Sequence, residues 1–345
     1  MRAKLTPGLV LLLLFFVAAA LLPFYVDPRG HVLRIAAMAL LFAALAQSWN
    51  IVGGLANQVS LGHAAFFGIG AYTSSLLYLR LGISPWLGLV AGAALAGLAA
   101  ALLSLPTFRL KGHYFALATL AFAEVMRVIA NSWASLTGGP VGVSIPFVGS
   151  QPLNFAFRAV SSYYWIILGL LALVCLVFGL LARGAIGYRL RAVRENEAAA
   201  EVAGVDTFRV KLTASVISAA LTAVCGSVFA QFTFFFDPDS IFSLAGVSVR
   251  MAMIAIVGGL GTLGGPIIGA LFLIPLEEAA NATLSSKAAG LSQLVFGAIL
   301  IAAILIQPRG IMAYWPKRWS RRVVAPAAAP AGRSPAVAAG TQGGK

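Results

Sequence analysis

The segment from Ser162 to Ala182 reads SYYWIILGLLALVCLVFGLLA and contains no charged residue over 21 consecutive positions. A helix needs about 20 predominantly apolar residues to cross the hydrocarbon core of a bilayer. A segment this long and this apolar predicts a membrane-spanning helix, and it decides the fold class of the chain.

Segments of the same kind recur on both sides of it. With the quoted segment they make ten, at 9–26, 32–52, 62–79, 86–105, 113–131, 162–182, 212–235, 246–258, 265–280 and 291–307. The eighth is too short to cross a core of ~30 Å unaided, and it runs into Gly258, Gly259 and Gly261, so we expect a broken or re-entrant helix there. We predict an all-α polytopic membrane protein with about ten transmembrane or partly spanning helices.

The composition of this 345-residue chain excludes several classes of protein. Hydrophobic residues make up 60% and charged residues 10%, whereas an ordinary soluble domain carries about 25% charged residues. A soluble fold could not remove so much apolar surface from water, which excludes a soluble enzyme, a disordered chain and a coiled coil. Cys175 and Cys225 both lie in apolar segments, so we expect small core residues and not a disulfide or a metal site.

The charge distribution predicts the orientation in the membrane. The chain has 24 Lys and Arg residues against 10 Asp and Glu residues. In a membrane protein such an excess reflects the positive-inside bias and not nucleic-acid binding. With the N-terminus in the cytoplasm, 17 basic residues fall in cytoplasmic segments and five in outer loops. The asymmetry predicts that both termini are cytoplasmic.

The first apolar segment allows two interpretations. Arg2 and Lys4 before it and the alanines at 18–20 are typical of a cleaved signal peptide. The segment stays apolar as far as Val26, which favours a retained first span.

The chain divides into two parts. Residues 1–310 form the transmembrane domain, with one large cytoplasmic loop at 183–211. Residues 311–345 open with basic residues interleaved with tryptophans: Trp315, Lys317, Arg318, Trp319, Arg321 and Arg322. That pattern predicts an anchor on an anionic lipid surface, followed from residue 323 by a disordered tail rich in Ala and Pro.

The large loop predicts a short cytoplasmic helix. Strong helix formers run from Glu195 to Ala203, with acidic residues early, where the helix dipole favours negative charge. Gly204 stands where a left-handed C-terminal cap is needed, and Asp206 can cap the following helix. A solvated basic loop with an incidental helix remains the alternative.

A polar stripe marks the segment 113–131. His113, Leu117, Leu120, Glu124, Arg127 and Asn131 follow alternating spacings of four and three residues, which place them on one helix face. Glu124 and Arg127 are three apart and can pair. Ionisable residues inside a span face protein or a water-filled path, so the pair either lines a path or holds two helices together.

Glycines and small polar residues gather where spans end. Gly258, Gly259, Gly261, Gly264, Gly265 and Gly269 surround Pro266 and include a formal G-x-G-x-x-G match. No soluble strand precedes this match, so close helix packing or a broken span explains it better than a dinucleotide site. Ser60, Gly62 and His63 follow another glycine pair, and a broken helix there would expose N–H groups able to hold a carboxylate. The sequence contains no nucleophile triad, metal-ligand spacing or Walker motif.

Together these stretches resemble the LivM-type permeases, the inner-membrane subunits of ATP-driven importers of branched-chain amino acids. The resemblance covers about residues 30–310. It rests on SLGHAAFFGIGAY at 60–72, LKGHYFA at 110–116 with Ala118-Thr119-Leu120 and Glu124, LTGGP at 136–140, RAVRENEAA at 191–199 with Gly204, DPDS at 237–240 and GGLGTLGGP at 258–266.

The resemblance implies a function and a set of partners. The chain would be a multi-pass permease subunit of the inner membrane, forming half of a pore for Leu, Ile and Val. A second homologous permease, two cytoplasmic ATP-binding subunits and an external substrate-binding protein would complete the importer. This chain would be no enzyme and would bind no cofactor, metal or nucleic acid, since ATP-Mg would be bound by the ATP-binding subunits.

The resemblance and the spacing also suggest roles for residues. The ATPase-coupling element comprises Glu195, Asn196, Glu197, Ala198, Ala199 and Gly204. The translocation path is predicted to contain Ser60, Gly62, His63, His113, Tyr114, Thr119, Glu124 and Arg127. Structural glycines and proline are Gly138, Gly139, Gly258, Gly259, Gly261 and Pro266.

Two alternatives stay open. The same importer architecture could carry urea, a sugar or another small polar solute. An ion-coupled secondary transporter, with Glu124 and Arg127 as an ion relay, is the other alternative. The predicted docking loop argues against it, because such a carrier has no ATPase to engage.

Overall fold

The structure is a computed structural model, and it describes residues 7–27, 30–110, 112–147, 149–284 and 310–314, with 294, 297, 298, 301 and 305. The chain divides into two units, Met1–Ala313 and Tyr314–Lys345. The features below belong to the first unit. The predicted basic anchor, the tail and most of the tenth apolar segment lie outside the described residues.

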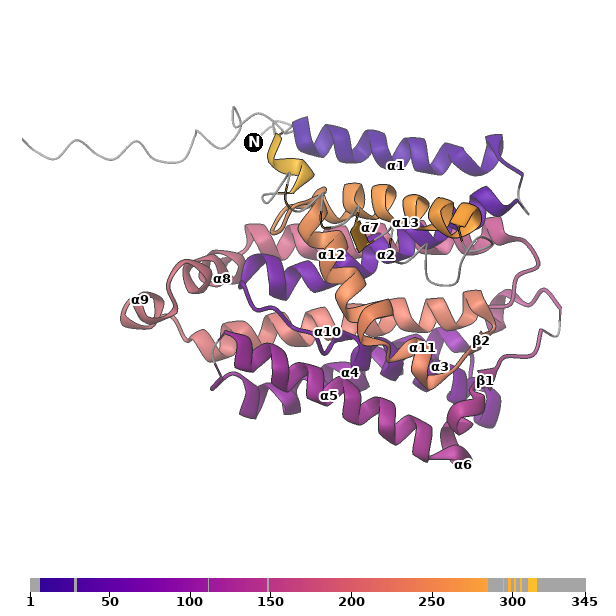
Figure 1. The fold of residues 1–345 in the computed structure, drawn as a ribbon, viewed down its shortest axis with the longest axis horizontal. Helices are drawn as coiled ribbons and strands as arrows, with labels where there is room; N and C mark the ends of the chain where they lie inside the picture. The colour runs from indigo at the N-terminus through magenta and orange to yellow at the C-terminus, as the bar shows by residue number, and fades with distance from the viewer. Residues whose placement is uncertain are drawn as a thin grey trace, which may run out of the picture. The chain divides into compact units, whose positions relative to one another are not determined.

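Long helices make up most of the described chain (Figure 1). They are α1 (Pro7–Tyr25), α2 (His31–Leu55), α3 (His63–Leu81), α4 (Pro85–Thr107), α5 (His113–Ser132), α7 (Val160–Arg183), α10 (Thr207–Thr233) and α13 (Gly265–Leu284). The shorter helices are α6 (Ala134–Thr137), α8 (Ala185–Glu195), α9 (Glu197–Val202), α11 (Pro238–Ile241) and α12 (Arg250–Gly258). Short 3₁₀ turns lie at Gly139–Val141, Pro152–Asn154 and Ile311–Tyr314, and a π-helical turn at Leu244–Val249.

The nine predicted apolar segments before residue 285 all form helices. Within the part of the chain that the structure describes, six stretches are long and apolar enough to cross a membrane: α2, α4, α5, α7, α10 and the run Pro238–Gly258. An all-α multi-pass membrane protein is therefore confirmed, while the count of ten and the side on which the termini lie stay predictions. One small β-pair was not expected: β1 (Val143–Ser144) runs antiparallel to β2 (Phe235–Phe236), with Val143 opposite Phe236.

The predicted break in the eighth segment is confirmed. After α11 the chain leaves the α-helical pattern at Phe242 and Ser243, makes the π-helical turn and enters α12. Helix α12 ends at Gly259, whose φ of 127° lies in the region that favours glycine. The whole run Pro238–Gly258 is long enough for one span, and it consists of three helical pieces: α11, the π-helical turn and α12.

Helices α2, α3 and α10 pack closely because small residues lie between them. A Cβ atom on Gly70 would lie 2.0 Å from the carbonyl oxygen of Ala223, and one on Gly226 would lie 2.0 Å from that of Phe67. Small residues allow membrane helices to approach at backbone distance. These contacts join α3 to α10, and the side chains of α2 from Ala39 to Leu55 are all buried.

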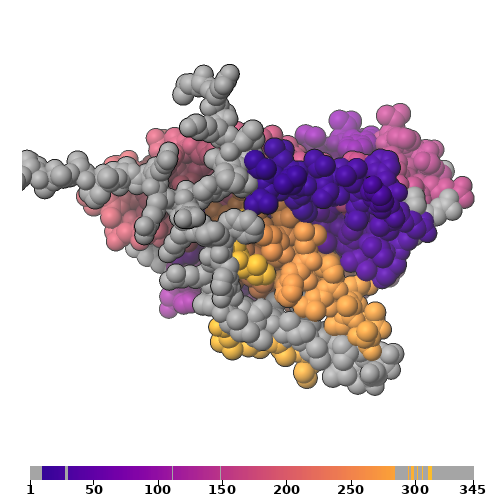
Figure 2. All heavy atoms as spheres, turned by 90° about the horizontal axis from the view of Figure 1, so that it is seen from above, coloured from indigo at the N-terminus to yellow at the C-terminus, as the bar shows by residue number. Residues whose placement is uncertain are grey.

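Several outer helices present apolar side chains to their surroundings. The exposed residues include Leu13, Leu14 and Val17 on α1, Leu98, Leu102 and Leu105 on α4, and Leu173, Leu176 and Leu180 on α7. Helices α1 and α13 reach the surface in Figure 2. Such faces are costly in water and suited to lipid.

The two ends of the long helices carry different connections. Helices α8 and α9 lie at one end, and α6, β1 and β2 at the other (Figure 1). At the second end Trp86 Nε1 donates to the Pro152 carbonyl at 2.9 Å, and Arg80 donates to the Leu136 carbonyl at 2.9 Å. The predicted cytoplasmic loop and the predicted outer loops thus occupy opposite ends.

Candidate functional site

The predicted coupling segment consists of two short helices instead of one. Glu195 is the last residue of α8, and Asn196 caps α9, its Oδ1 accepting a hydrogen bond from Ala199 N at 3.1 Å. An asparagine at this position satisfies one of the free N–H groups of a helix start. The expected single helix from Glu195 to Ala203 is therefore corrected to α8, a cap and α9.

The end of α9 follows the prediction. Gly204 has a φ of +85°, and its N–H donates to the Glu201 carbonyl at 2.9 Å. Asp206 then caps α10, its Oδ1 accepting from Arg209 N at 3.0 Å. Ala198, Ala199 and Gly204 are exposed, so a surface of small residues is open to a partner.

Lys211 links this segment to the membrane helices. It lies near the start of α10 with only 4% of its side chain exposed, and its Nζ donates to Glu197 Oε1 at 2.5 Å. The same Nζ lies 5.3 Å from the centre of the Phe108 ring, which follows α4. Buried charges require a partner, so Glu197 points inward to Lys211 and ties α9 to α10.

A second link joins α8 to the C-terminal end of α2, and we call its residues the inner clasp, after the cytoplasmic side predicted for this loop: Asn50, Gly54, Arg194, Gly261 and Thr262. Arg194 Nη1 donates to the Gly54 carbonyl at 2.7 Å. Asn50 Nδ2 donates to the Thr262 carbonyl at 2.9 Å, and Gly261 N donates to Asn50 Oδ1 at 2.8 Å.

The clasp explains why this part of the chain is rich in glycine. Gly261 has a φ of +71°, and a Cβ on Gly54 would lie 2.6 Å from Gly261 N. A Cβ on Gly258 would lie 1.9 Å from the Gly265 carbonyl oxygen, next to Pro266 at the start of α13. The glycines serve close backbone approach, as the packing interpretation of the G-x-G-x-x-G match predicted.

A buried polar network holds the break between α2 and α3. The His63 ring nitrogens lie 3.0 Å from Ser60 Oγ and 2.9 Å from Ser218 Oγ. Ser218 Oγ donates to the Ser48 carbonyl at 2.7 Å, and Trp49 Nε1 donates to the Ser60 carbonyl at 2.7 Å. His63 is therefore a buried, hydrogen-bonded residue, with one partner in the α2–α3 break and one on α10.

Two more predicted path residues join this network. Leu61 N donates to Thr119 Oγ1 at 3.0 Å, and a Cβ on Gly62 would lie 2.7 Å from the Thr119 carbonyl oxygen. Ser60, His63 and Thr119 line a small cavity that also contacts α4. His113 and Tyr114 lie apart from it, exposed at the first turn of α5.

The predicted pair on α5 forms, and it includes a third member that the sequence did not indicate. Arg127 Nε donates to Glu124 Oε2 at 3.1 Å, and Arg127 Nη1 donates to Asp239 Oδ1 at 2.5 Å. Asn131 Nδ2 also donates to Asp239 Oδ1, at 3.1 Å. The carboxylates are 50% and 61% exposed. Charged side chains within a span are found next to protein or water and not next to lipid.

Gly138 and Gly139 shape the turn after α5 and α6. Their φ values are +78° and +57°, and a Cβ on Gly139 would lie 3.1 Å from the Asn131 carbonyl oxygen. Thr137 Oγ1 donates to the Ala130 carbonyl at 2.6 Å and closes the turn onto α5. Both glycines thus adopt a conformation that favours glycine.

Lys211, Arg194 and Asp239 are the charged residues that sequence reasoning missed at these sites. Asp239 belongs to the quoted DPDS motif, but it lies 112 residues from Arg127, and no local spacing relates the two. Arg194 belongs to the quoted RAVRENEAA motif, but its contact with Gly54 lies 140 residues away in sequence. Among the described residues no group of three or more His, Cys, Asp or Glu side chains is placed to hold a metal ion.

Comparison with known families gives a match over most of the chain. The profile of the family described as "Branched-chain amino acid transport system / permease component" matches residues 31–304. No solved structure matches the chain significantly.

Curated proteins with similar sequences are named as permeases of two kinds. The high-affinity branched-chain amino acid transport system permease protein LivM of Escherichia coli K12 is 32% identical over 87% of this chain and 74% of its own length. The corresponding LivH protein of Salmonella typhimurium is 28% identical over 79% of this chain and 91% of its own length. A probable LivM protein of Methanocaldococcus jannaschii is 23% identical over 80% of this chain and 84% of its own length.

Proposed function

The chain belongs to the family of branched-chain amino acid transport permease components, and we propose that it is one permease subunit of an ATP-driven importer of Leu, Ile and Val. It would form half of the pore in the inner membrane. The observation that carries the proposal is the exposed α8–α9 segment, tied to the membrane helices by Lys211 and Arg194. The same segment argues against an ion-coupled carrier, because such a carrier has no ATP-binding subunit to dock on it.

The importer would divide its tasks among several proteins. Relatives of both the LivM and the LivH kind are known, which supports a second, homologous permease as the partner across the pore. Two ATP-binding subunits would bind ATP-Mg and dock on α9, and an external binding protein would deliver the amino acid at the opposite end. This chain would perform no covalent chemistry and need no cofactor.

The two links give the coupling a physical route. When nucleotide draws the ATP-binding subunits together, α9 moves with them as a rigid body. The Lys211–Glu197 pair passes that displacement to α10, and Arg194 passes it through the Gly54 carbonyl to the inner clasp. The clasp joins α2 to the loop before α13, so the movement reaches the helices that flank the break at residues 56–62.

One wall of the path is best sought on the α5–α11 face. The exposed faces of α1, α4 and α7 carry apolar side chains, whereas this face carries Glu124, Arg127 and Asp239. A face with exposed charges in a span borders water or a partner subunit. We place His113 and Tyr114 at the inner end of this path. The buried residues of the network would not contact the solute. They would fix the break between α2 and α3 against α5, and they are Ser60, Gly62, His63 and Thr119.

Uptake into vesicles tests the proposal. Vesicles holding this chain with its candidate second permease, ATP-binding subunits and external binding protein are expected to accumulate leucine only with hydrolysable ATP, and excess valine is expected to compete. Uptake that continues without ATP and stops when the ion gradient is abolished would replace the proposal with a secondary transporter. ATP-dependent uptake that is blocked only by urea or ribose would keep the importer and change its solute.

A further inference from the structure

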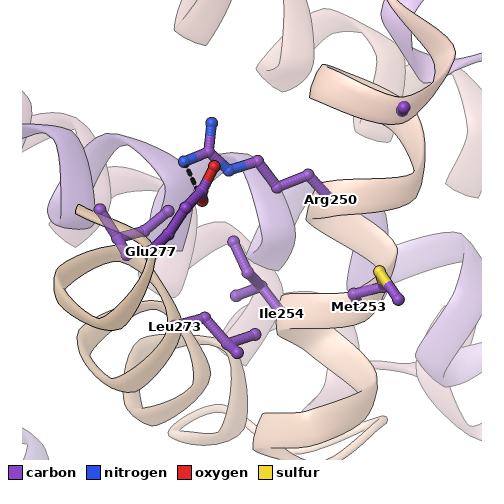
Figure 3. A pocket seen from close by; sticks show the side chains of 7 residues that line it. Arg250, Met253, Ile254, Leu273 and Glu277 are labelled. Atoms are coloured by element: carbon purple, nitrogen blue, oxygen red, sulfur yellow. Dashed lines mark hydrogen bonds and ion pairs between the residues drawn. The ribbon is translucent and has the colours of Figure 1, made fainter. Parts of the chain in front are cut away.

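A pocket lies between α12 and α13, outside the cluster on α5. Arg250, Met253 and Ile254 extend into it from α12, and Leu273 and Glu277 from α13 (Figure 3). Ala245 of the π-helical turn and Ile274 complete the lining. The space measures about 340 Å³ when its open mouth is counted.

The pocket has a charged end and an apolar end. Arg250 Nη2 donates to Glu277 Oε2, and each of these side chains is 26% exposed. The Arg250 guanidinium also lies over the Phe42 ring, 4.3 Å from its centre, which fixes its position against α2. The remaining lining side chains belong to Ala, Met, Ile and Leu residues, so an apolar wall faces an ion pair.

The ion pair leaves most of its hydrogen-bonding capacity unused. A guanidinium has five N–H donors, and with the described residues Arg250 makes one hydrogen bond. Its Nε is buried and has no described partner. Glu277 Oε1 likewise accepts no bond from a described residue. Inside a span an unsatisfied donor on a charged group is costly, which points to a further group that binds here.

We propose that this pocket is an intramembrane binding site for the zwitterionic hydrophobic amino acid during its passage. The free edge of the Arg250 guanidinium takes the carboxylate in two parallel N–H···O bonds, as arginine does elsewhere. Glu277 Oε1 takes the ammonium. The side chains of Met253, Ile254, Leu273 and Ile274 contact the branched side chain. The inference rests on the proposed import of Leu, Ile and Val and adds the place where the permease itself recognises them.

The chemistry of the site selects among solutes. An amino acid presents opposite charges on one carbon atom, which match the guanidinium and carboxylate held by α12 and α13. Urea and sugars have no charge to replace the ion-pair contact and no branch for the apolar wall. A site that offers buried charged donors discriminates strongly against a ligand that leaves them unpaired.

Substitutions of Glu277 and Arg250 test the charged end, and Glu278 provides the matched control. Glu278 is the next residue on α13 and pairs with His31 at 3.4 Å, outside the pocket lining. In vesicles with the complete importer, Glu277→Gln and Arg250→Lys are expected to lower the maximal rate of leucine uptake about tenfold, and Glu278→Gln by less than about twofold. The membrane level of each variant and its ATP hydrolysis with leucine-loaded binding protein are measured alongside, so that a loss of assembly is separated from a loss of solute binding.

Met253→Trp tests the apolar end by filling the pocket. It is expected to lower leucine uptake about fivefold more than valine uptake, because leucine has the larger side chain of the two solutes and no longer fits the filled pocket. Unchanged leucine uptake in Glu277→Gln with an unchanged leucine-to-valine ratio in Met253→Trp would overturn the site. So would a loss of membrane level or of stimulated ATP hydrolysis that accounts for the lost uptake, since the pair would then be structural. If the unaltered importer takes up no leucine with ATP, the proposed function itself fails, whatever the variants do.

Discussion

The α9–α10 junction and the α12–α13 pocket each hold an ion pair between a basic residue and a glutamate, and the two basic residues differ in how they are enclosed. The Lys211 side chain is enclosed, since it is 4% exposed and lies against Phe108, while its partner Glu197 is 30% exposed. Arg250 and Glu277 are each 26% exposed and open onto a cavity. An enclosed pair can transmit displacement but has no room for a ligand, whereas an open pair can exchange its partner.

Breaking the enclosed pair is expected to have the largest effect. Lys211→Ala leaves Glu197, which is 30% exposed, without its cation, and leaving a partly buried polar group unpaired costs about 1–3 kcal/mol. We expect a lower unfolding temperature of the solubilised complex and more ATP hydrolysed per leucine transported. Unchanged stability and an unchanged ATP-to-leucine ratio would contradict the idea that this pair carries the coupling.

The α5–α11 cluster is an intermediate case, since its charges are exposed but its guanidinium is bonded to two carboxylates. Arg127→Ala would leave Glu124 and Asp239 without a cation and is expected to destabilise the protein less than Lys211→Ala does, because both carboxylates are exposed. The expected result is a reduced membrane level, with partial recovery in Arg127→Lys. If Arg127→Ala instead keeps its membrane level and loses only leucine uptake, the cluster belongs with the open pair as a contact of the solute.

A backbone change near the enclosed pair is expected to have a smaller effect. Gly204→Val places a β-branched residue at a φ of +85°, where a side chain costs about 1–2 kcal/mol. No atom lies within 4 Å of the added Cβ, so the effect comes from the backbone alone. Leucine uptake per ATP should fall while the membrane level holds. Gly204→Asn is the control, because asparagine tolerates this conformation, and equal losses in both variants would show that the backbone is not the cause.

The smallest effect is expected at an exposed pair beside the enclosed one. Arg209 Nε lies 3.0 Å from Asp206 Oδ2, with side chains 84% and 52% exposed. Such pairs contribute about 0–1 kcal/mol, so Arg209→Ala should leave stability and leucine uptake nearly unchanged. A loss as large as that of Lys211→Ala would mean that total positive charge, and not enclosure, decides the effect.

The features that local pattern determines were predictable from the sequence. The length of the apolar segments predicted the helices. The glycine after α9 predicted a residue in the left-handed conformation, and the spacing of three residues between Glu124 and Arg127 predicted their pairing. Asp206 as a cap follows from the same local chemistry. Each of these depends on residues within one or two turns of one another.

The remaining features depend on tertiary packing. Asp239 reaches Arg127, and Arg194 reaches Gly54, only after helices far apart in sequence have packed. Burial of Lys211 could not be read from a basic loop, and the Arg250–Glu277 pair requires α12 to lie on α13. His63 was open to a path role or a packing role, and its hydrogen bonds to Ser60 and Ser218 account for its place in the interior.

The π-helical turn at Leu244–Val249 sets the rotational phase of all that follows it up to Gly258. Successive residues of an α-helix are about 100° apart around its axis, and a π-helical turn accommodates one additional residue. Deleting one residue from this turn would rotate Arg250 and Met253 away from α13 without altering either side chain. Insertions and deletions in this short stretch therefore offer evolution a way to exchange the whole set of residues that α12 presents, in a single step.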